Sequence, residues 1–557
     1  MTTIDTRPDA DAVSGDAVDD STVVSFFTTA GAWVVTTDHK RIGRIFVGVG
    51  LLALAASAVL GLLLGLERAD DGSALLDADA LLQLFQAYRV GLVFGAIIPL
   101  TLGLAVAIVP LQVGARSIAF PRVALTGCYA WLGGLALTMA ALGRNGGIGG
   151  GDANMVDLFL AGHGLMIVGL VAAAGCVATT VLTTRAPGMT MRRVPLFAWS
   201  SLVGAIGIVL ALPVVFGVIV YLFVDHRLGL GANFGGGEGI ADWIGWAFSV
   251  PAVAVYSLPA LGVAAELVPV TFRQRQAMRG VAYAGLALVG VTALAATTQQ
   301  FVHDVTIDTD ATTFFEGVFP FLIFAGLPVL GVLVVMATGA LTAKQGAANG
   351  RPRISAGFVF SFLGLGMVFV GLVANFLLGI TDLELLGTSM EEGATVYVVY
   401  GSALGVMGGL AFWAPKLWGR VLPDAKAIPL ALLGVLATIL AALPLCVGAF
   451  FDLPGGIPAN DAQVGAVLSL DGVDGGSIWI VLSLVGHALM VLTVLAFAGL
   501  MLATFTGDGE AAEANPAGGQ TIEWSTASPA PADNYEHVAT VASAEPLFDL
   551  AQEGSPS

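Results

Sequence analysis

The feature that most constrains this chain is a series of twelve apolar stretches, each long enough to cross a lipid bilayer. A transmembrane helix needs about 20 mainly apolar residues to span a hydrocarbon core of ~30 Å. A chain in lipid must satisfy its backbone polar groups internally, so stretches this long are expected to be helical. The sequence therefore predicts an all-α integral membrane protein with spans near residues 43–66, 84–111, 123–143, 157–183, 195–224, 241–270, 279–300, 312–342, 354–379, 395–415, 427–450 and 478–505.

Composition supports this fold class and excludes several others. Hydrophobic residues make up 57% of the chain and charged residues 11%, which is not typical of a water-soluble domain. The 73 glycines are expected to let membrane helices approach closely, and their runs in connections lack the strand-to-helix context of a nucleotide site. The three cysteines, one in each of three spans, are expected to be packing residues. A net charge of −18 argues against binding to nucleic acid.

The distribution of basic residues predicts the orientation and the domain limits. Alternate connections carry most of the lysines and arginines, whereas the opposite connections hold only Arg68, Arg144 and Arg227. By the positive-inside rule both termini are expected to be cytoplasmic. We expect an acidic, disordered arm over 1–35, a twelve-helix membrane domain over 36–506 and a cytoplasmic C-terminal tail over 507–557.

Short motifs in a fixed order carry a resemblance to a known family. They include TDHKRIG at 37–43, VPLQVGAR at 109–116 with AFPR at 119–122, VPLFAWS at 194–200, Trp524 and the Pro529-x-Pro531 tail. In this order and spacing they resemble subunit I of cytochrome c oxidase, a member of the haem-copper oxidase superfamily, from about residue 31 to 550. The resemblance implies a twelve-transmembrane-helix bundle of the cytochrome c oxidase subunit I type.

The resemblance also implies six histidine ligands for two haems and one copper ion, and this sequence departs from that pattern. The haem-ligand positions correspond to Tyr88, Gly393 and Thr395, and the copper-ligand positions to Val250 and to two residues within Thr298, Gln299 and Gln300. Val and Gly have no side-chain donor for iron or copper, and imidazole is absent from every one of these positions. We therefore expect no haem and no copper. The alternative is that haem and copper are bound by ligands placed elsewhere.

Other positions that the family uses for proton transfer and haem contacts are replaced too. They correspond to Ser117, Ala252, Ala254, Val332, Gly455 and Gly456. Only His163 and His487 lie within predicted spans, where hydrogen bonds to neighbouring helices are the expected role and ligation of one haem is the alternative. On an outer loop, His303 with Asp304, Asp308 and Asp310 is expected to be a solvated acidic segment rather than a cation site.

Arg89 is the one basic residue predicted to lie away from the edge of a span, beside Tyr88. A charge inside the membrane is a functional candidate, with possible partners Tyr88, Gln86, Thr297, Thr298, Gln299, Gln300, Glu391 and Glu392. The alternative is that Arg89 lies near the end of its helix and extends to water. Glu266, near Arg273, is expected to form an interfacial salt bridge. The candidate functional polar residues are thus Arg89, Tyr88, Gln299 and Gln300.

Two main functions remain open from the sequence. The first is a non-redox paralogue that supplies a structural, assembly or regulatory surface within a respiratory membrane complex, with no catalytic residues. The second is a working cytochrome c oxidase subunit I, which transfers electrons to oxygen and translocates protons. A third is a small-molecule or ion pathway through the emptied cofactor cavities. The expected partners are the lipid bilayer and other oxidase-type subunits, in a prokaryotic-type cytoplasmic membrane.

Overall fold

The computed structural model describes residues 31, 33, 35–69, 76, 78–148, 150–231, 246–248, 250–298, 318–455, 470, 473, 475–507, 511–538 and 540–553. Within those ranges the chain is helical, and the only β-type pairing is an isolated bridge between Thr388 and Pro454. The main helices are α2 (His39–Ala69), α3 (Ala78–Val90), η1 (Gly91–Ile97), α4 (Ile98–Gln112), α5 (Pro121–Leu142), α6 (Ala153–Thr183), α7 (Leu196–Leu228), α9 (Val250–Phe272), α10 (Arg279–Gly290), α11 (Ala293–Thr298), α13 (Phe319–Phe321), η5 (Leu322–Gly326), α14 (Leu327–Gly346), α15 (Ala356–Leu378), α16 (Met390–Trp418), α17 (Asp424–Gly448), α19 (Gly476–Thr506), η9 (Ile522–Ser525) and α20 (Pro546–Glu553).

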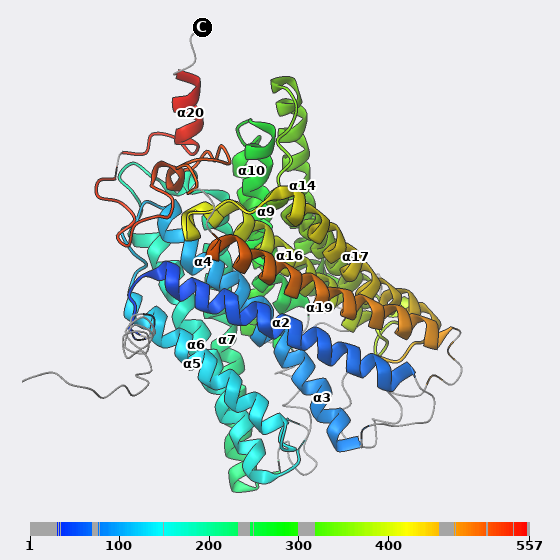
Figure 1. Ribbon diagram of the computed structural model, residues 1–557. Helices are drawn as coiled ribbons and strands as arrows, with labels where there is room; N and C mark the ends of the chain where they lie inside the picture. The colour runs from blue at the N-terminus through cyan, green and yellow to red at the C-terminus, as the bar shows by residue number, and fades with distance from the viewer. Residues whose placement is uncertain are drawn as a thin grey trace, which may run out of the picture.

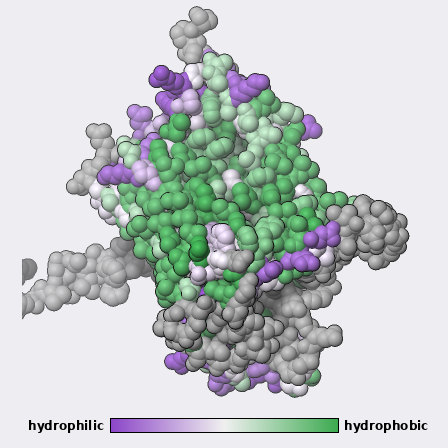
Figure 2. All heavy atoms as spheres, turned by 90° about the vertical axis from the view of Figure 1, so that its right-hand side faces the viewer, coloured by the Kyte–Doolittle hydropathy of each residue, from purple (hydrophilic) through white to green (hydrophobic). Residues whose placement is uncertain are grey.

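Twelve helical segments in the described ranges are long and apolar enough to cross a membrane, which confirms the predicted number. Each lies over one of the predicted apolar stretches. Figure 1 shows them as one bundle in which α2 and α19 run side by side, with the C-terminal segment beside the start of α2. A wide hydrophobic band crosses the face in Figure 2, and hydrophilic residues gather above and below it. This is the surface expected of a protein embedded in hydrocarbon.

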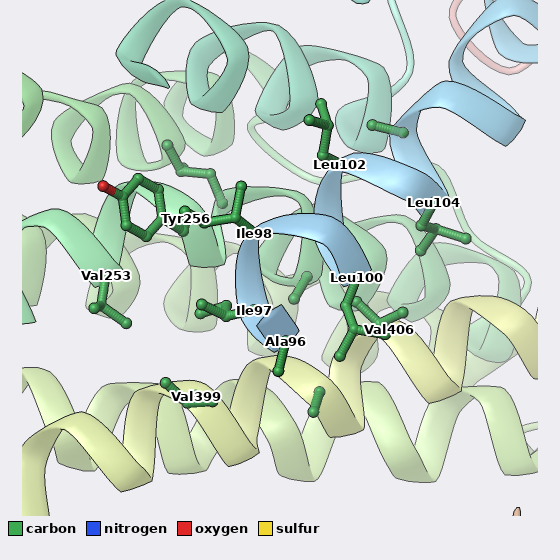
Figure 3. Close-up of a cluster of buried hydrophobic side chains, with 14 of the residues drawn as sticks. Ala96, Ile97, Ile98, Leu100, Leu102, Leu104, Val253, Tyr256, Val399 and Val406 are labelled. Atoms are coloured by element: carbon green, nitrogen blue, oxygen red, sulfur yellow. The ribbon is translucent and has the colours of Figure 1, made fainter. Parts of the chain in front are cut away.

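Three segments form the centre of the bundle. The most apolar windows of Ala80–Gln112 and Ala252–Phe272 are 100% buried and that of Met390–Trp418 is 94% buried, whereas the other nine windows are 28–61% buried. Figure 3 shows side chains of η1 and α4 packed toward α9 and α16. Two of these three segments carry Tyr88, Arg89, Gly393 and Thr395.

Local chemistry explains several helix ends and close contacts. The Asp152 carboxylate caps α6 by accepting hydrogen bonds from the backbone N–H groups of Asn154 and Met155 at 3.0 and 3.1 Å. Between α5 and α6 the backbones approach so closely that a Cβ on Gly127 would lie 2.6 Å from the carbonyl oxygen of Gly169. Small residues permit this approach, as expected for membrane helices.

A π-helical segment, η1, links α3 to α4 and begins two residues after Arg89. The indole Nε1–H of Trp131 in α5 donates a hydrogen bond to the carbonyl of Phe94 in this segment, at 2.8 Å. Because π-helical geometry interrupts the regular hydrogen-bond ladder, it often accompanies functional sites. Here it lies next to the polar residues that form the candidate site.

Candidate functional site

Two arginines and two glutamates meet where α2, α3 and α16 converge, at the end of the bundle opposite the start of α2. We call Arg68, Arg89, Glu391, Glu392 and Thr395 the far-end cluster. In this cluster Arg89 Nη2 lies 3.1 Å from Glu391 Oε1, and Arg89 Nη1 donates to Thr395 Oγ1 at 3.2 Å. Arg89 is only 5% exposed. Its side chain is therefore held inside the protein, and the alternative prediction that it extends to water is wrong.

The second ion pair joins α2 to the residue beside Glu391. Arg68 Nη1 lies 3.2 Å from Glu392 Oε2, and Arg68 Nη2 donates to the carbonyl of Pro454. Both side chains are almost fully buried. The sequence pattern assigned Arg68 to a connection between spans, so its role was missed. The available signal was the position of Arg68 in the last turn of an apolar helix, directly after another charged residue.

Helix geometry favours this arrangement of charges. Glu391 and Glu392 lie in the first turn of α16, where the helix dipole stabilises negative charge, and Arg68 lies in the last turn of α2, where it stabilises positive charge. Two arginines against two glutamates also make the cluster formally neutral. Pairing is needed because an isolated charge at this depth is strongly unfavourable.

A row of rings lies next to the cluster. Tyr88 is 1% exposed and packs edge-on against His487 of α19, with ring centroids 5.9 Å apart. His487 Nδ1 lies 2.7 Å from the hydroxyl of Tyr400 in α16. This bond confirms the predicted helix-to-helix role of His487. The Tyr88 hydroxyl is buried, and no residue that the structure describes forms a hydrogen bond with it.

The position of Gly393 is closed by helix packing. A Cβ on Gly393 would lie 2.6 Å from Cys446 Sγ and 3.0 Å from the carbonyl oxygen of Ala442, both on α17.

All three cysteines are buried and unpaired, as predicted for packing residues. The side chains of Val250 and Thr298, and all of Gln299 and Gln300, lie outside the described residues, as do Gly456 and the loop from His303 to Asp310. Ala252 and Ala254 are fully buried.

Two predicted polar contacts differ in the structure. His163 is buried among Phe94, Phe159 and Phe248, and neither ring nitrogen has a hydrogen-bond partner within the described part of the chain. The predicted bond to a neighbouring helix is therefore wrong for this residue. Glu266 accepts hydrogen bonds from the first backbone N–H groups of α7, at Leu196 and Phe197. It caps that helix, because the fold brings the start of α7 against α9, and its predicted salt bridge with Arg273 is not among the ion pairs of the described residues.

The C-terminal segment forms a cap at the other end of the bundle. Asn534 contacts His39 Nε2 at 2.9 Å and accepts from Lys40 Nζ at 3.0 Å, so the TDHKRIG motif and the tail bind one another. Glu523 is fully buried, and its Oε1 accepts hydrogen bonds from Gln112, Trp413 and Thr521. Burial raises the pKa of Glu523, against the opposing effect of these hydrogen bonds.

The described part of the chain contains no group of three or more His, Cys, Asp and Glu side chains placed to hold a metal ion. Its chemistry is that of paired charges and hydrogen-bonded rings buried between transmembrane helices. The fold and this site define a polytopic helical membrane protein with buried, paired charges at one end of the bundle.

Comparison with known proteins identifies the family. The family model "Cytochrome C and Quinol oxidase polypeptide I" matches residues 41–504, and the chain belongs to this family. Cytochrome c oxidase subunit 1 of Bacillus subtilis is 24% identical over 94% of this chain and 84% of its own length. Its counterpart in Corynebacterium glutamicum is 27% identical over 93% of this chain and 89% of its own length. A solved heme-copper terminal oxidase dimer has the same fold, with a TM-score of 0.63 and 15% identity over 86% of this chain and 85% of that chain.

Proposed function

We propose that this chain is a redox-silent member of its family that serves as a structural or assembly component of a respiratory membrane complex. The observation that carries the proposal is the bonding of Thr395. At this predicted haem-ligand position the hydroxyl accepts a hydrogen bond from Arg89 and donates one to the carbonyl of Glu391 at 2.8 Å. An arginine side chain thus occupies the approach to the position where the family would place an axial imidazole.

The donor set at the predicted haem positions also supports the proposal. Haem iron in this family is expected to take neutral imidazole, and glycine at 393 offers no donor atom. Tyrosine is an iron ligand in some haem proteins, but the second predicted position for that haem, Thr395, is already bonded to Arg89. The residues present fit haem poorly, and we assign no reaction step to it. Close packing of Gly393 against Cys446 adds to this misfit.

A structural role accounts for what the chain retains. The match to the family runs through nearly all twelve spans, although the predicted ligand positions hold other residues. Docking requires the outward faces of this framework and does not require its redox centres. We propose that these outward faces contact other membrane subunits of a bacterial respiratory complex, in the cytoplasmic membrane and with both termini inside the cell.

The alternative is a working cytochrome c oxidase subunit I, which family membership favours. In that case the metals would be bound by residues other than those predicted, or by part of the chain outside the described residues. This function requires haem and copper in fixed proportion to the protein. The two functions are therefore separable by chemistry performed on the purified chain.

The test uses the full-length chain purified in detergent from a host that supplies haem and copper, with the Bacillus subtilis relative prepared in parallel. We expect the relative to show an intense Soret band, and this chain to show none and to contain neither iron porphyrin nor copper in amounts comparable with the protein. Oxygen consumption with a reduced electron donor should likewise be confined to the relative. Stoichiometric haem and copper in this chain would overturn the proposal in favour of terminal oxidase activity.

A further inference from the structure

A crevice of about 70 Å³ opens between α2, α4, α16 and α19, at the end of the bundle where the tail packs. Apart from one guanidinium, that of Arg44, its lining consists of glycines and apolar side chains. Val47 and Leu51 of α2, Trp418 of α16 and Met501 of α19 form much of the wall. It lies far from the far-end cluster, because α2 and α16 begin and end at opposite ends of the bundle.

The mouth of the crevice opens on the lipid-facing surface. Gly48, one of its lining residues, is exposed, and a Cβ added there would meet no atom within 4 Å. Nearby on the two helices that border the mouth, Leu52 of α2 is 63% exposed and Leu502 of α19 is 66% exposed. An apolar depression bordered by such residues faces hydrocarbon when the protein lies in a bilayer, so its natural occupant is an acyl chain.

Arg44 gives the crevice a charge at its interfacial end. One Nη2–H of Arg44 donates to the carbonyl of Leu417, and the guanidinium lies 5.2 Å from the centroid of the Trp418 ring. Its Nε is buried and has no hydrogen-bond partner among the described residues. The acidic residue nearest in sequence, Asp38, is paired with Lys40 at 2.9 Å and also attracts the guanidinium of Arg44. The guanidinium has N–H groups besides the one bonded to Leu417, and guanidinium matches the oxygens of phosphate well.

We propose that this crevice binds one anionic phospholipid, with an acyl chain in the apolar cleft and the phosphate on Arg44. Each part of the ligand has a partner: hydrocarbon against α2 and α19, and negative charge against the guanidinium beside an interfacial tryptophan. A zwitterionic lipid shares the chain but carries a compensating amine, and inorganic phosphate lacks the chain. The inference is independent of whether the protein carries haem.

The experiment measures lipid retention by native mass spectrometry of the delipidated full-length protein, titrated with phosphatidylglycerol and phosphatidylcholine together. We expect wild type to retain one phosphatidylglycerol in preference to phosphatidylcholine. Arg44→Met keeps a long apolar side chain but loses the charge, together with the contacts of the guanidinium with the Trp418 ring and the Leu417 carbonyl. It should lower this preference about fivefold, the effect of one basic residue near an anionic surface. Arg44→Lys should retain most of the preference.

Two further variants separate the chain-binding part from the headgroup-binding part. Gly48→Leu places a side chain in open space at the mouth, so it should fold and should lower the retention of both lipids. Arg122→Ala removes an exposed arginine from the first turn of α5, outside the crevice, and should change nothing. Equal retention of the two lipids by wild type would overturn the proposal. Full displacement of phosphatidylglycerol by inorganic phosphate would also overturn it. So would a dimer of the wild-type chain that dissociates in Gly48→Leu, because the crevice would then bind a second copy of the chain.

Discussion

Arg89 and Glu391 form an ion pair of 3.1 Å that joins α3 to α16, and the next residue along α16, Glu392, forms the matching pair with Arg68 of α2. The two pairs differ in solvent access, because the Glu391 side chain is 40% exposed and that of Glu392 is 11% exposed. Glu391 and Glu392 therefore join α16 to α3 and to α2. The first pair is partly open to water and the second is buried.

This difference predicts unequal effects of the same substitution. Glu392→Gln leaves the buried Arg68 without a counter-charge and should destabilise the protein by about 3–5 kcal/mol, the range for breaking a buried pair. Glu391→Gln should cost less, about 1–3 kcal/mol, because water reaches position 391, although Arg89 stays buried with Thr395 as its remaining partner. Thermal unfolding of both variants in detergent measures the difference. Equal losses of stability in the two variants would contradict the difference in solvent access. Added salt should weaken only the contribution of the Arg89–Glu391 pair.

Asn534 is expected to be central to the attachment of the tail. Its side chain contacts His39, Lys40 and the carbonyl of Ala115, and its φ of 58° lies in the left-handed region that asparagine tolerates better than alanine. Asn534→Ala should lose about 2–4 kcal/mol through both effects. Asn534→Gly loses the contacts without the strain, so it should be the milder variant. Unfolding midpoints and the rate of protease cleavage of the tail should both show a larger effect for Asn534→Ala than for Asn534→Gly. A larger effect of the glycine variant would refute the contribution assigned to the positive φ.

Tail docking should weaken as pH rises. The pKa of Glu523 is raised by burial, so the folded protein holds this proton at pH values where the unfolded chain has already lost it. The resulting stability is complete below the unfolded pKa and is lost as pH rises through the folded pKa. Hydrogen exchange over residues 511–538, measured from about pH 5 to pH 8 and corrected for its intrinsic pH dependence, should show growing exposure.

Glu523→Gln should remove this pH dependence, since an amide does not ionise and retains an oxygen for the three donors. The control is Glu536→Gln, which alters an exposed carboxyl group in the same segment. A pH response that survives Glu523→Gln, or disappears in Glu536→Gln, would show that another group controls the tail.

Helix approach between α5 and α6 should tolerate no side chain at Gly127. A Cβ there meets the backbone oxygen of Gly169, which has no flexible atoms to move, so Gly127→Ala should destabilise the protein by about 1–3 kcal/mol. Gly175→Ala is the matched control, because a Cβ at Gly175 has no atom within 4 Å. It should leave stability unchanged or slightly raised. Equal melting temperatures for the two variants would contradict this packing.

The fold was largely predictable because the information for membrane spans is local. Each span is visible as a long apolar stretch, and the order of short motifs along the chain was sufficient to indicate the family. The site was predictable only in part. Arg89 was identified as an unusual residue and Glu391 as one of its possible partners, but the bond between Arg89 and Thr395 was not foreseen.

Other contacts could not be predicted from the sequence, for identifiable reasons. Arg68 at the end of a span looks the same as a residue in a connection, and only its distance to Glu392 shows that it is buried. His163 was expected to have a partner, but its surroundings are three phenylalanine rings from separate segments. Glu266 was paired with a neighbour in sequence, whereas its hydrogen bonds reach a helix end 70 residues away.

The amino-acid sequence by itself determined that this is a twelve-span helical membrane protein with the framework of its family, because hydrophobic length and backbone hydrogen bonding in lipid leave few other solutions. Only the tertiary structure decided which polar groups meet. Ion pairs such as Arg68–Glu392 and contacts such as His39–Asn534 join residues separated by 324 and 495 positions. Such pairings depend on how the helices pack and rotate against one another, and side-chain geometry at those crossings is set by the whole bundle rather than by any one segment.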